Sequence, residues 1–457
     1  MSRSATDAGA ALAEARAALE AGRLDEADRL CRAILADAPD DPGAQHLHGI
    51  VAFRSGDAKG GAALLERAIA HAPANAVYRR DLCEMLRVLG QLDGALAQGR
   101  RAVALAPDDA GAHYNLGIVH YDRCELEVAI ACQRRAIEIA PDHAAAHFEL
   151  AEALLLSGDL ARGWPEYEWR YRMPGAPALL PPTERPQWNG EAAGTVLLIA
   201  DQGFGDTIQF ARYIPAASRR CARLLVACSA EMETLIAPLP GIARIYRNWQ
   251  DIGAFDAYAP LSSLPYLFGT DLASIPPSVP YLRAKPARSA RWRDRLDQLV
   301  SASHRRIGLV WAGRPSHGND ANRSLPLERL APLAALDGTT LIALQTGPAR
   351  RQIGGFYATL PLLNLGPELA DFADTAAVID ALDLVISVDT AVAHLCGALA
   401  KPVWLLLPFA PDWRWLLGRD DSPWYPTMRL FRQQAPGDWA AVVASVVDRL
   451  RQGREER

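Results

Sequence analysis

The sequence contains no uncharged apolar run of 18 residues and no apolar core of the signal-peptide type near its start. We therefore expect neither a transmembrane segment nor a secretion signal, and we expect the protein to be cytoplasmic. The seven cysteines form no Cys-x-x-Cys pair and have no histidine at the spacing of a zinc site. Because such spacings mark disulfide frameworks and zinc sites, we expect reduced thiols and no bound metal.

Lysine is scarce: only three of the 48 basic residues are lysines, and the 53 acidic residues give a net charge of −5. A chain with this balance has no overall positive field, so nucleic acid and anionic membranes are not expected partners. Any phosphate contact would fall to arginine. The chain has 457 residues, of which 50% are hydrophobic and 22% charged. This composition is typical of a globular protein of two or three domains.

A 34-residue period runs through the first third of the chain. It is marked by prolines, by glycines, and by small residues five positions after the glycines, at Pro39, Pro73, Pro107 and Pro141, at Gly22, Gly56, Gly90, Cys124 and Gly158, and at Ala27, Gly61, Ala95, Ala129 and Gly163. Apolar residues between these marks follow a helical spacing. Each period therefore predicts two helices that approach closely at the small residues, the second helix ending at the proline.

The period and its pattern resemble the tetratricopeptide repeat (TPR), most clearly over residues 111–144. Four repeats follow the pattern and a fifth, from Ala145, loses it, so we predict a TPR α-solenoid over residues 1–172. Such a solenoid has a concave groove suited to a peptide or a partner helix. A spacer, or an arm through which copies of the chain form a homo-oligomer, is the alternative.

Four aromatic residues and a proline-rich stretch follow the repeats. Trp164, Tyr167, Trp169 and Tyr171 lie within eight residues of one another. We interpret them as a packed cap between the last repeat and the next domain rather than as a ligand platform. The segment 173–194 predicts a stiff linker because of its prolines.

Short apolar runs alternate with helical stretches in the rest of the chain. The strand-like runs fall into two blocks, 195–200, 223–229 and 256–261 in the first and 306–313, 339–345, 382–388 and 402–408 in the second. Continuous Val, Ile and Leu runs of this kind are typical of parallel strands covered on both faces. We therefore predict two Rossmann-like halves, 195–303 and 304–457, the second ending in a helix, with a cleft between them.

The first strand of the first half is followed by the turn DQGFGD (201–206). Gly203 and Gly205 allow a tight turn and a close approach of the backbone to a ligand. Asp206 lies at the start of the next helix, where it fits an N-terminal cap at least as well as a catalytic group. The third glycine of a dinucleotide fingerprint is missing, so no dinucleotide cofactor is predicted.

In the second half, Asp389 and Thr390 follow a strand and precede a helix. The free backbone N–H groups from Ala391 onward and the helix dipole predict an anion site. In this interpretation Thr390 donates a hydroxyl, Asp389 accepts from sugar hydroxyls, and His394 reaches a phosphate. A capped helix with a satisfied core histidine is the alternative.

A polar loop after another strand, residues 311–330, carries Arg314, His317, Asn319 and Arg323. Two arginines suit a diphosphate, because a guanidinium group binds phosphate oxygens as a fork and stays charged. Loops of this composition are more often merely solvated. The prediction therefore depends on the convergence of three strand-end loops from the two halves.

The segments YEWRYR, DQGFGDTIQFARY, GLVWAGRPSHGND and DFADTAAVIDALDLVISVDTAVAHLCGALAKPVW lie between residues 164 and 439. With the repeats, they make the chain similar to bacterial TPR proteins fused to a glycosyltransferase family 9-like domain, related to the lipopolysaccharide heptosyltransferases. The resemblance implies a GT-B fold, Asp206 as the general base of an inverting transfer, and a donor site at residues 388–394. The sequence departs from the heptosyltransferase pattern at Ala391, where glycine is usual. No Asp-x-Asp triplet occurs, which is consistent with a metal-independent reaction.

We therefore predict a GT-B glycosyltransferase that moves a sugar from a nucleotide-sugar donor to an acceptor without a further cofactor. The predicted donor-binding residues are Gly203, Gly205, Arg314, Asn319, Arg323, Asp389, Thr390, Ala391 and His394. A protein acceptor in the TPR groove, such as flagellin or another surface protein, is favoured because a superhelical groove suits peptides. Lipopolysaccharide core is the alternative acceptor. The competing hypothesis is a non-catalytic TPR scaffold with a degenerate GT-B domain.

Overall fold

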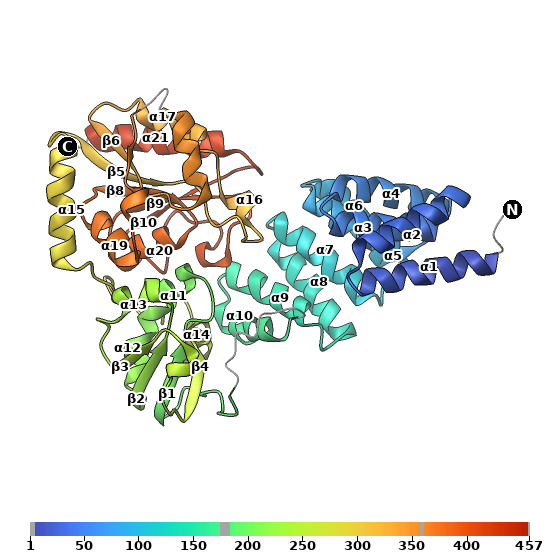
Figure 1. Cartoon of the computed structure of the whole chain (residues 1–457), viewed down its shortest axis with the longest axis horizontal. Helices are drawn as coiled ribbons and strands as arrows, with labels where there is room; N and C mark the ends of the chain where they lie inside the picture. The colour runs from blue at the N-terminus through green and yellow to red at the C-terminus, as the bar shows by residue number, and fades with distance from the viewer. Residues whose placement is uncertain (1–4, 174–182, 357–360, 456–457) are drawn as a thin grey trace. The chain divides into compact units, whose positions relative to one another are not determined.

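The computed structural model describes residues 5–173, 183–356 and 361–455. The chain divides into two compact units, residues 1–154 and 155–457. The first unit is helical, whereas the second contains two parallel sheets with helices around them (Figure 1). Of the predicted linker 173–194, residues 174–182 lie outside the described residues.

The first unit consists of helices of similar length joined by short turns (Figure 1). They are α1 (Ala5–Glu20), α2 (Leu24–Asp37), α3 (Pro42–Arg54), α4 (Ala58–His71), α5 (Ala76–Val88), α6 (Leu92–Leu105), α7 (Ala110–Asp122), α8 (Leu126–Ile139) and α9 (Ala144–Leu156), whose last two residues belong to the second unit. Asp41, Asn75 and Asp109, again 34 residues apart, cap α3, α5 and α7 by accepting backbone N–H groups. Such caps satisfy donors that the first turn leaves free. The 34-residue period therefore sets where the first helix of each pair begins.

The small residues of the period mark where paired helices touch. A Cβ on Gly49 of α3 would lie 2.2 Å from Leu65 Cδ1 of α4, and one on Gly61 would lie 2.7 Å from the Gly49 carbonyl oxygen. No side chain fits at either position, so glycine permits the close approach. The predicted pairing of helices through small residues is confirmed at this contact.

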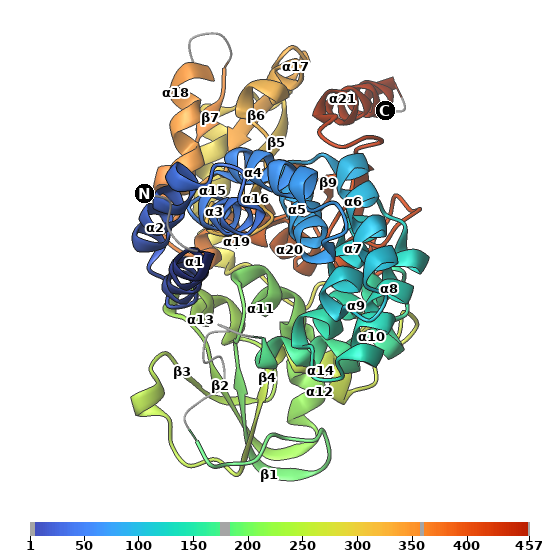
Figure 2. The same ribbon diagram turned by 90° about the vertical axis from the view of Figure 1, so that its right-hand side faces the viewer.

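The first sheet of the second unit has four parallel strands in the order β3-β2-β1-β4 (Figure 2). Its strands are β1 (Ala193–Ile199), β2 (Cys221–Ala227), β3 (Ile242–Tyr246) and β4 (Ala257–Pro260). In the register of the sheet, Val196 of β1 lies opposite Leu224 of β2 and Ala257 of β4. β1 therefore occupies the interior of the sheet, with the loop 200–203 at its carboxyl end.

The second sheet has six parallel strands in the order β10-β9-β8-β5-β6-β7. Its strands are β5 (Arg305–Val310), β6 (Thr339–Ala343), β7 (Leu363–Asn364), β8 (Leu384–Val388), β9 (Val403–Leu407) and β10 (Met428–Arg432). If β5 is numbered 1 and the sheet is read from β7 to β10, the order is 3-2-1-4-5-6. This is the doubly wound Rossmann order. In both sheets the strand order reverses beside the first strand, between β1 and β4 and between β5 and β8. Such sheets take their ligands at the carboxyl ends of the strands at that point.

Helices and short 3-10 segments precede, connect and follow the strands. They are α10 (Leu160–Tyr167), η1 (Glu168–Arg172), α11 (Phe204–Phe210), η2 (Ala211–Tyr213), α12 (Ile214–Ser218), α13 (Ala230–Ile236), η3 (Trp249–Asp251), η4 (Leu261–Ser263), α14 (Leu264–Leu267), α15 (Pro286–Leu299), α16 (Asp320–Arg323), η5 (Leu327–Leu330), α17 (Ala331–Ala334), η6 (Pro348–Gln352), α18 (Ile353–Phe356), η7 (Gly366–Glu368), α19 (Phe372–Asp380), α20 (Ala391–Ala398), η8 (Trp413–Trp415) and α21 (Trp439–Glu455).

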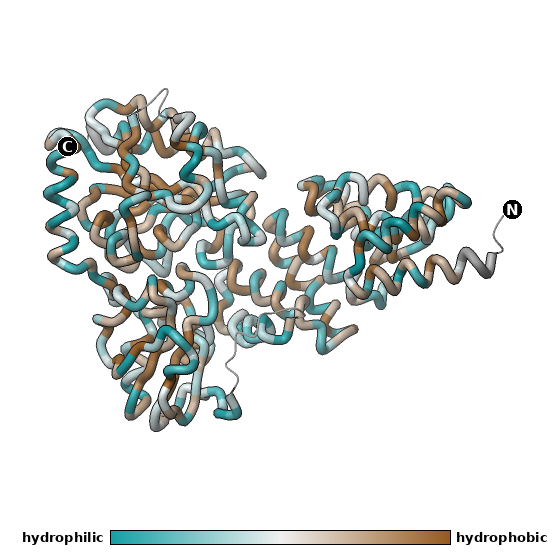
Figure 3. Tube along the Cα trace, viewed as in Figure 1, coloured by the Kyte–Doolittle hydropathy of each residue, from teal (hydrophilic) through white to brown (hydrophobic). Residues whose placement is uncertain are grey.

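The hydrophobic core of the second unit lies on its sheets. Figure 3 shows hydrophobic colour along the central strands and hydrophilic colour along the peripheral helix α15. The C-terminal helix α21 buries Trp439, Val443 and Val447 in the cluster that covers the second sheet. None of the seven cysteines, all of them among the described residues, forms a disulfide.

The fold class is confirmed as a TPR solenoid followed by two parallel α/β halves, but the boundary of the first unit differs from the expected 1–172. Leu155 begins the second unit. The reason is that α10 and η1 pack on the α/β region: the Trp164 indole N–H donates to the Thr270 carbonyl at 2.8 Å. Its ring also meets that of Trp413 edge-on, with centroids 5.2 Å apart.

Candidate functional site

The loops at the carboxyl ends of the strands bring both halves of the second unit into contact. They are the loop after β1 (200–203), the loop after β5 (311–319), the turn after β8 (389–390) and the loop after β9 (408–412). Helix α11, which follows the first loop, packs against α20, which follows the third. A Cβ added to Gly205 would lie 3.0 Å from His394 Cδ2 and 3.7 Å from Ala391 Cα. Gly205 therefore permits the close approach of α20, and the predicted approach of the backbone to a ligand stays a prediction.

Arg414 joins the first half to the second at the centre of these loops. The residue is 6% exposed, and its Nη2 donates to Asp206 Oδ1. Its Nη1 donates to both carboxylate oxygens of Asp412 at 2.9 Å, and its Nε donates to Gln209 Oε1 at 2.6 Å. The guanidinium carbon also lies 4.2 Å from the centroid of the Trp413 ring. A buried cation thus bridges two carboxylates from opposite halves.

The surroundings of Asp206 suit a proton acceptor. Burial raises the pKa of Asp206, Arg414 opposes this rise, and the negative charges of Asp412 and Asp201 add to it. A carboxylate with a raised pKa accepts a proton more readily, which is what a general base requires near neutral pH. Asp206 lies in the first turn of α11, whose N-cap is Gly203, so it is not itself the capping residue.

Asp389 and His394 are buried side by side at the N-terminus of α20. Burial raises the pKa of Asp389 to about 6, and Asp412 contributes to the rise. Burial lowers the pKa of His394 well below its ordinary value, and Arg414, Arg212 and Arg323 lower it further. His394 Nδ1 lies 2.9 Å from the Tyr425 hydroxyl. This arrangement favours a neutral core histidine, and the contact of His394 with a phosphate stays a prediction.

The first turn of α20 has two backbone N–H groups outside its helical hydrogen bonds. Thr390 is the N-cap, and its hydroxyl lies 3.1 Å from Ser387 Oγ instead of capping the helix. The first hydrogen bond of the helix is donated by the Ala393 N–H to the Thr390 carbonyl. The N–H groups of Ala391 and Val392 precede that bond, as an anion site at a helix N-terminus requires.

The loop after β5 contributes its predicted residues unequally. Arg323 Nε donates to Asp320 Oδ1 at 3.3 Å. Burial lowers the pKa of His317, and the charge of Arg323 lowers it further. Arg314 is exposed, with its guanidinium carbon 5.6 Å from the centroid of the Phe204 ring. Asn319 accepts from Asn322 at 2.7 Å within its own turn. Arg314 thus lies against α11 and Arg323 acts on Asp389 and His394, whereas Asn319 serves the loop itself.

Sequence reasoning missed Arg414, Asp412 and Gln209. Arg414 and Asp412 belong to the segment PDWRW, which follows β9, so a systematic search of strand-end loops would have included them. Gln209 lies one turn after Asp206 in α11 and is fully buried. Nothing in its local sequence distinguishes it from a core residue, because its role depends on Arg414.

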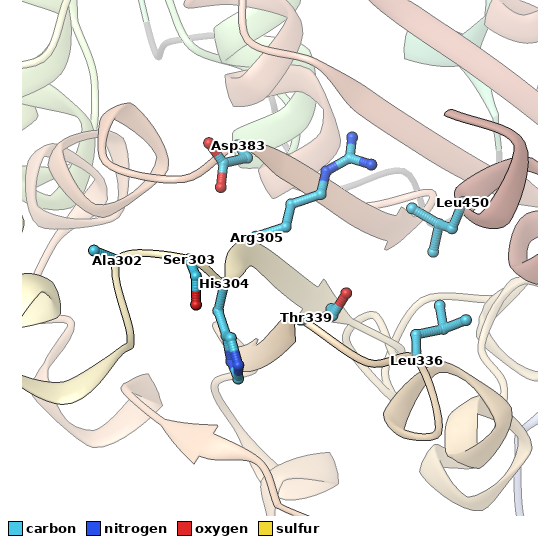
Figure 4. A pocket seen from close by; sticks show the side chains of 9 residues that line it. Ala302, Ser303, His304, Arg305, Leu336, Thr339, Asp383 and Leu450 are labelled. Carbon is cyan, nitrogen blue, oxygen red and sulfur yellow. The ribbon is translucent and has the colours of Figure 1, made fainter. Parts of the chain in front are cut away.

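A hollow of about 400 Å³ lies at the opposite end of the second sheet (Figure 4). It is lined by Ser303, His304, Arg305, Thr339 and Asp383 among others. These residues stand at or before the amino ends of β5, β6 and β8. Parallel sheets of this order bind ligands at their carboxyl ends, so the strand-end loops are the better candidate site.

Over residues 5–173, 183–356 and 361–455, His, Cys, Asp and Glu side chains form no group of three that could hold a metal ion. Within the same described parts, no helix combines the length and the apolar character needed to span a membrane.

Comparison with protein families identifies the repeats of the first unit. A TPR repeat model matches residues 84–123, and tetratricopeptide repeat models match residues 12–76 and 110–143. The chain therefore contains TPR repeats, as its period predicts.

A curated relative, protein FlbA of Caulobacter vibrioides, is 29% identical over 331 residues. The alignment covers 66% of this chain and 54% of FlbA, so the chain spans about half the length of that relative.

Solved structures are similar to a part of the chain. A fragment of MamA from Desulfovibrio magneticus RS-1 is 22% identical with a TM-score of 0.32, covering 35% of this chain and 91% of that one. PilF of Pseudomonas aeruginosa is 17% identical with a TM-score of 0.35, covering 37% of this chain and 78% of that one. A thermophilic TPR protein of Thermus thermophilus is 22% identical with a TM-score of 0.33, covering 36% of this chain and 90% of that one.

Proposed function

We propose that the protein is a glycosyltransferase of the GT-B type that transfers a sugar from a nucleotide-sugar donor to an acceptor. The observation that carries the proposal is the hydrogen bond from Arg414 to Asp206. It joins the two halves at the carboxyl ends of their parallel strands. A base on one half and cationic or N–H donors on the other match the two needs of the reaction. The resemblance to glycosyltransferase family 9 at these segments supports the same activity.

In the proposed reaction, an acceptor hydroxyl oxygen attacks the anomeric carbon of the donor sugar. Its proton passes to Asp206, the bond from that carbon to the phosphate oxygen breaks, and the nucleoside diphosphate leaves. Negative charge grows on the leaving diphosphate during this step. The N–H groups at the start of α20, together with Arg323 and Arg314, are the donors that would stabilise it.

The acceptor in this proposal is a protein, such as flagellin or another surface protein, that binds in the groove of the TPR repeats. Stacked helical repeats form extended concave surfaces that hold peptides. Lipopolysaccharide core is the alternative acceptor, and sugar transfer to it is measured beside transfer to the protein.

The proposal is tested by donor binding, donor hydrolysis and sugar transfer across a panel of nucleotide sugars. We expect one donor to be turned over by the wild type and turnover to fall at least about 100-fold in Asp206→Asn, because the base is lost while the side-chain shape is kept. Asp421→Asn is the matched control, since Asp421 pairs with Arg419 and is 65% exposed. Undiminished transfer by Asp206→Asn would remove Asp206 from the mechanism, and the absence of any bound donor would refute the transferase.

The unit boundary defines the fragments that test the acceptor. Residues 1–154 should capture the protein acceptor, and residues 155–457 should bind the donor. Capture of the acceptor by 155–457 alone would refute the role of the groove.

A TPR scaffold without catalysis is the second candidate. It is favoured by the family matches, all of which fall on the repeats. It predicts acceptor capture by residues 1–154 with no donor bound by the full chain.

A further inference from the structure

A side chain from the segment that precedes the first sheet occupies the ligand position of that sheet. The position lies between the carboxyl ends of β1 and β4, where the strand order reverses. Asp201 follows β1, and Ser262 and Ser263 follow β4. Arg170 of η1 inserts here: its Nη2 donates to Ser262 Oγ at 2.7 Å and to Ser263 Oγ at 3.0 Å. The first half therefore holds a guanidinium group where an open sheet would hold its ligand.

Arg170 is 6% exposed and fully engaged. Its Nη1 donates to the Tyr167 carbonyl at 2.7 Å and to Glu168 Oε1 at 2.8 Å, and its Nη2 donates to the Tyr171 hydroxyl at 2.6 Å. The Tyr171 hydroxyl in turn donates to Asp201 Oδ2 at 2.9 Å. A buried cation is tolerated only when its hydrogen bonds are complete, and such networks hold their members in one geometry.

The network reaches Asp206 through the amide of Gln202. Only one orientation of this amide satisfies its neighbours. In that orientation the Gln202 oxygen accepts from Arg170 Nε at 3.1 Å and from the Tyr167 hydroxyl at 3.2 Å. Its nitrogen then donates to Asp206 Oδ1 at 3.2 Å. One amide thus separates Arg170 from the carboxylate that we assign as the base.

We propose that Arg170 is a positioning residue for Asp206 and acts through Gln202, so that η1 is part of the transferase site although it precedes both Rossmann-like halves. This inference rests on the proposed function. Arg170 orients the Gln202 oxygen, which turns the amide N–H toward the carboxylate. The donated hydrogen bond stabilises the ionised form of Asp206 and fixes its direction.

Other charged groups also act on Asp206 and must stay constant in a test. Arg414 donates to the same oxygen, Oδ1, from η8, and Asp412 and Asp201 contribute negative charge from the loops after β9 and β1. None of these three side chains is altered by a change at Gln202. A shift in the titration of Asp206 on changing Gln202 therefore reports the lost amide bond.

The test compares Arg170→Lys and Gln202→Leu with the wild type, and Arg172→Lys serves as the matched control. Arg172 lies two residues further along η1 and is exposed, with its guanidinium carbon 4.4 Å from the centroid of the Trp169 ring. In the full chain labelled at aspartate carboxyl carbons, the Asp206 signal is assigned from Asp206→Asn and followed against pH. We expect Asp206 to titrate about half a pH unit or more higher in Arg170→Lys and Gln202→Leu, because the carboxylate loses a donor.

Turnover supplies a second readout. The acid limb of the pH profile of kcat should move upward by the same amount, with KM for the donor unchanged, because the loops after β5 and β8 are not altered. If Arg170→Lys does not fold, the titration of Asp206 in Gln202→Leu decides the proposal. This variant removes the amide through which Arg170 acts and leaves the serine and tyrosine contacts of Arg170 in place. Identical titration of Asp206 in the wild type and in the folded variants would overturn the proposal. A wild type without turnover would refute the glycosyltransferase, while the carbon signal would still decide the role of Arg170.

Discussion

Replacing Arg414 by methionine should destabilise the second unit strongly at neutral pH. Arg414 is buried and donates to Asp206, Asp412 and Gln209. Methionine has a comparable length but no charge, so two carboxylates would face each other without the cation between them. Breaking a buried ion pair by removing one partner destabilises a protein by about 3–5 kcal/mol. We expect an effect of this size for Arg414→Met.

The loss of stability in Arg414→Met should depend on pH. Arg414 lowers the pKa of Asp206, so its removal raises that pKa further above its value in the unfolded chain. The folded variant then binds a proton that the unfolded chain releases, and its stability falls as the pH rises. The difference from the wild type should therefore shrink as the pH is lowered from about 8 to about 5.

Urea unfolding followed by tryptophan fluorescence isolates this effect. All 11 tryptophans lie at or after Trp164, so the signal comes from the second unit alone. Arg419→Met is the matched control, because Arg419 pairs with a carboxylate that is 65% exposed and such pairs contribute about 1 kcal/mol or less. An Arg414→Met variant no less stable than Arg419→Met, or one whose deficit does not depend on pH, would refute the reasoning.

Three further predictions concern backbone conformation and a second buried carboxylate. Cys124 has a φ of 58° at the position where the other repeats have glycine. Cys124→Gly should therefore raise the unfolding free energy of residues 1–154 by about 1 kcal/mol. Gly90→Ala should lower it by a similar amount, and circular dichroism measures both changes. Ala400 has φ of 57° before β9, so Ala400→Gly should raise the urea midpoint of the second unit, and a lowered midpoint would contradict this. Burial raises the pKa of Asp389 from 3.8 to about 6, so the contribution of Asp389 to the unfolding free energy falls as the pH rises between those values. In Asp389→Asn this fall should be smaller by up to about 3 kcal/mol, measured by urea unfolding at a series of pH values.

The strands that sequence analysis missed share one property. β3 and β10 end their sheets on one side, and β7 ends the second sheet on the other. An edge strand is covered on fewer sides, so it needs no continuous apolar run: β3 carries Arg244, and β10 carries Arg429 and Arg432. The interior strands were all predicted, because burial on both faces demands mainly apolar runs.

The candidate site was predicted in its parts and not in its arrangement. The turn with Asp206 and the turn with Asp389 were identified because each follows a buried strand. Asp206 as the base stays a prediction. The contact of Asp206 with Arg414, 208 residues apart, was outside the reach of local patterns.

The sequence by itself determined the helix pairs of the repeats and the interior strands of both sheets. These depend on periodicity and on residues a few positions apart, which act through local backbone and burial requirements. Tertiary structure alone decided that α10 and η1 belong to the second unit, that Arg414 bridges its two halves, and that Arg170 lies between β1 and β4. The physical reason is that a buried charge requires partners from distant segments, and only the packing of those segments brings the partners within hydrogen-bonding distance.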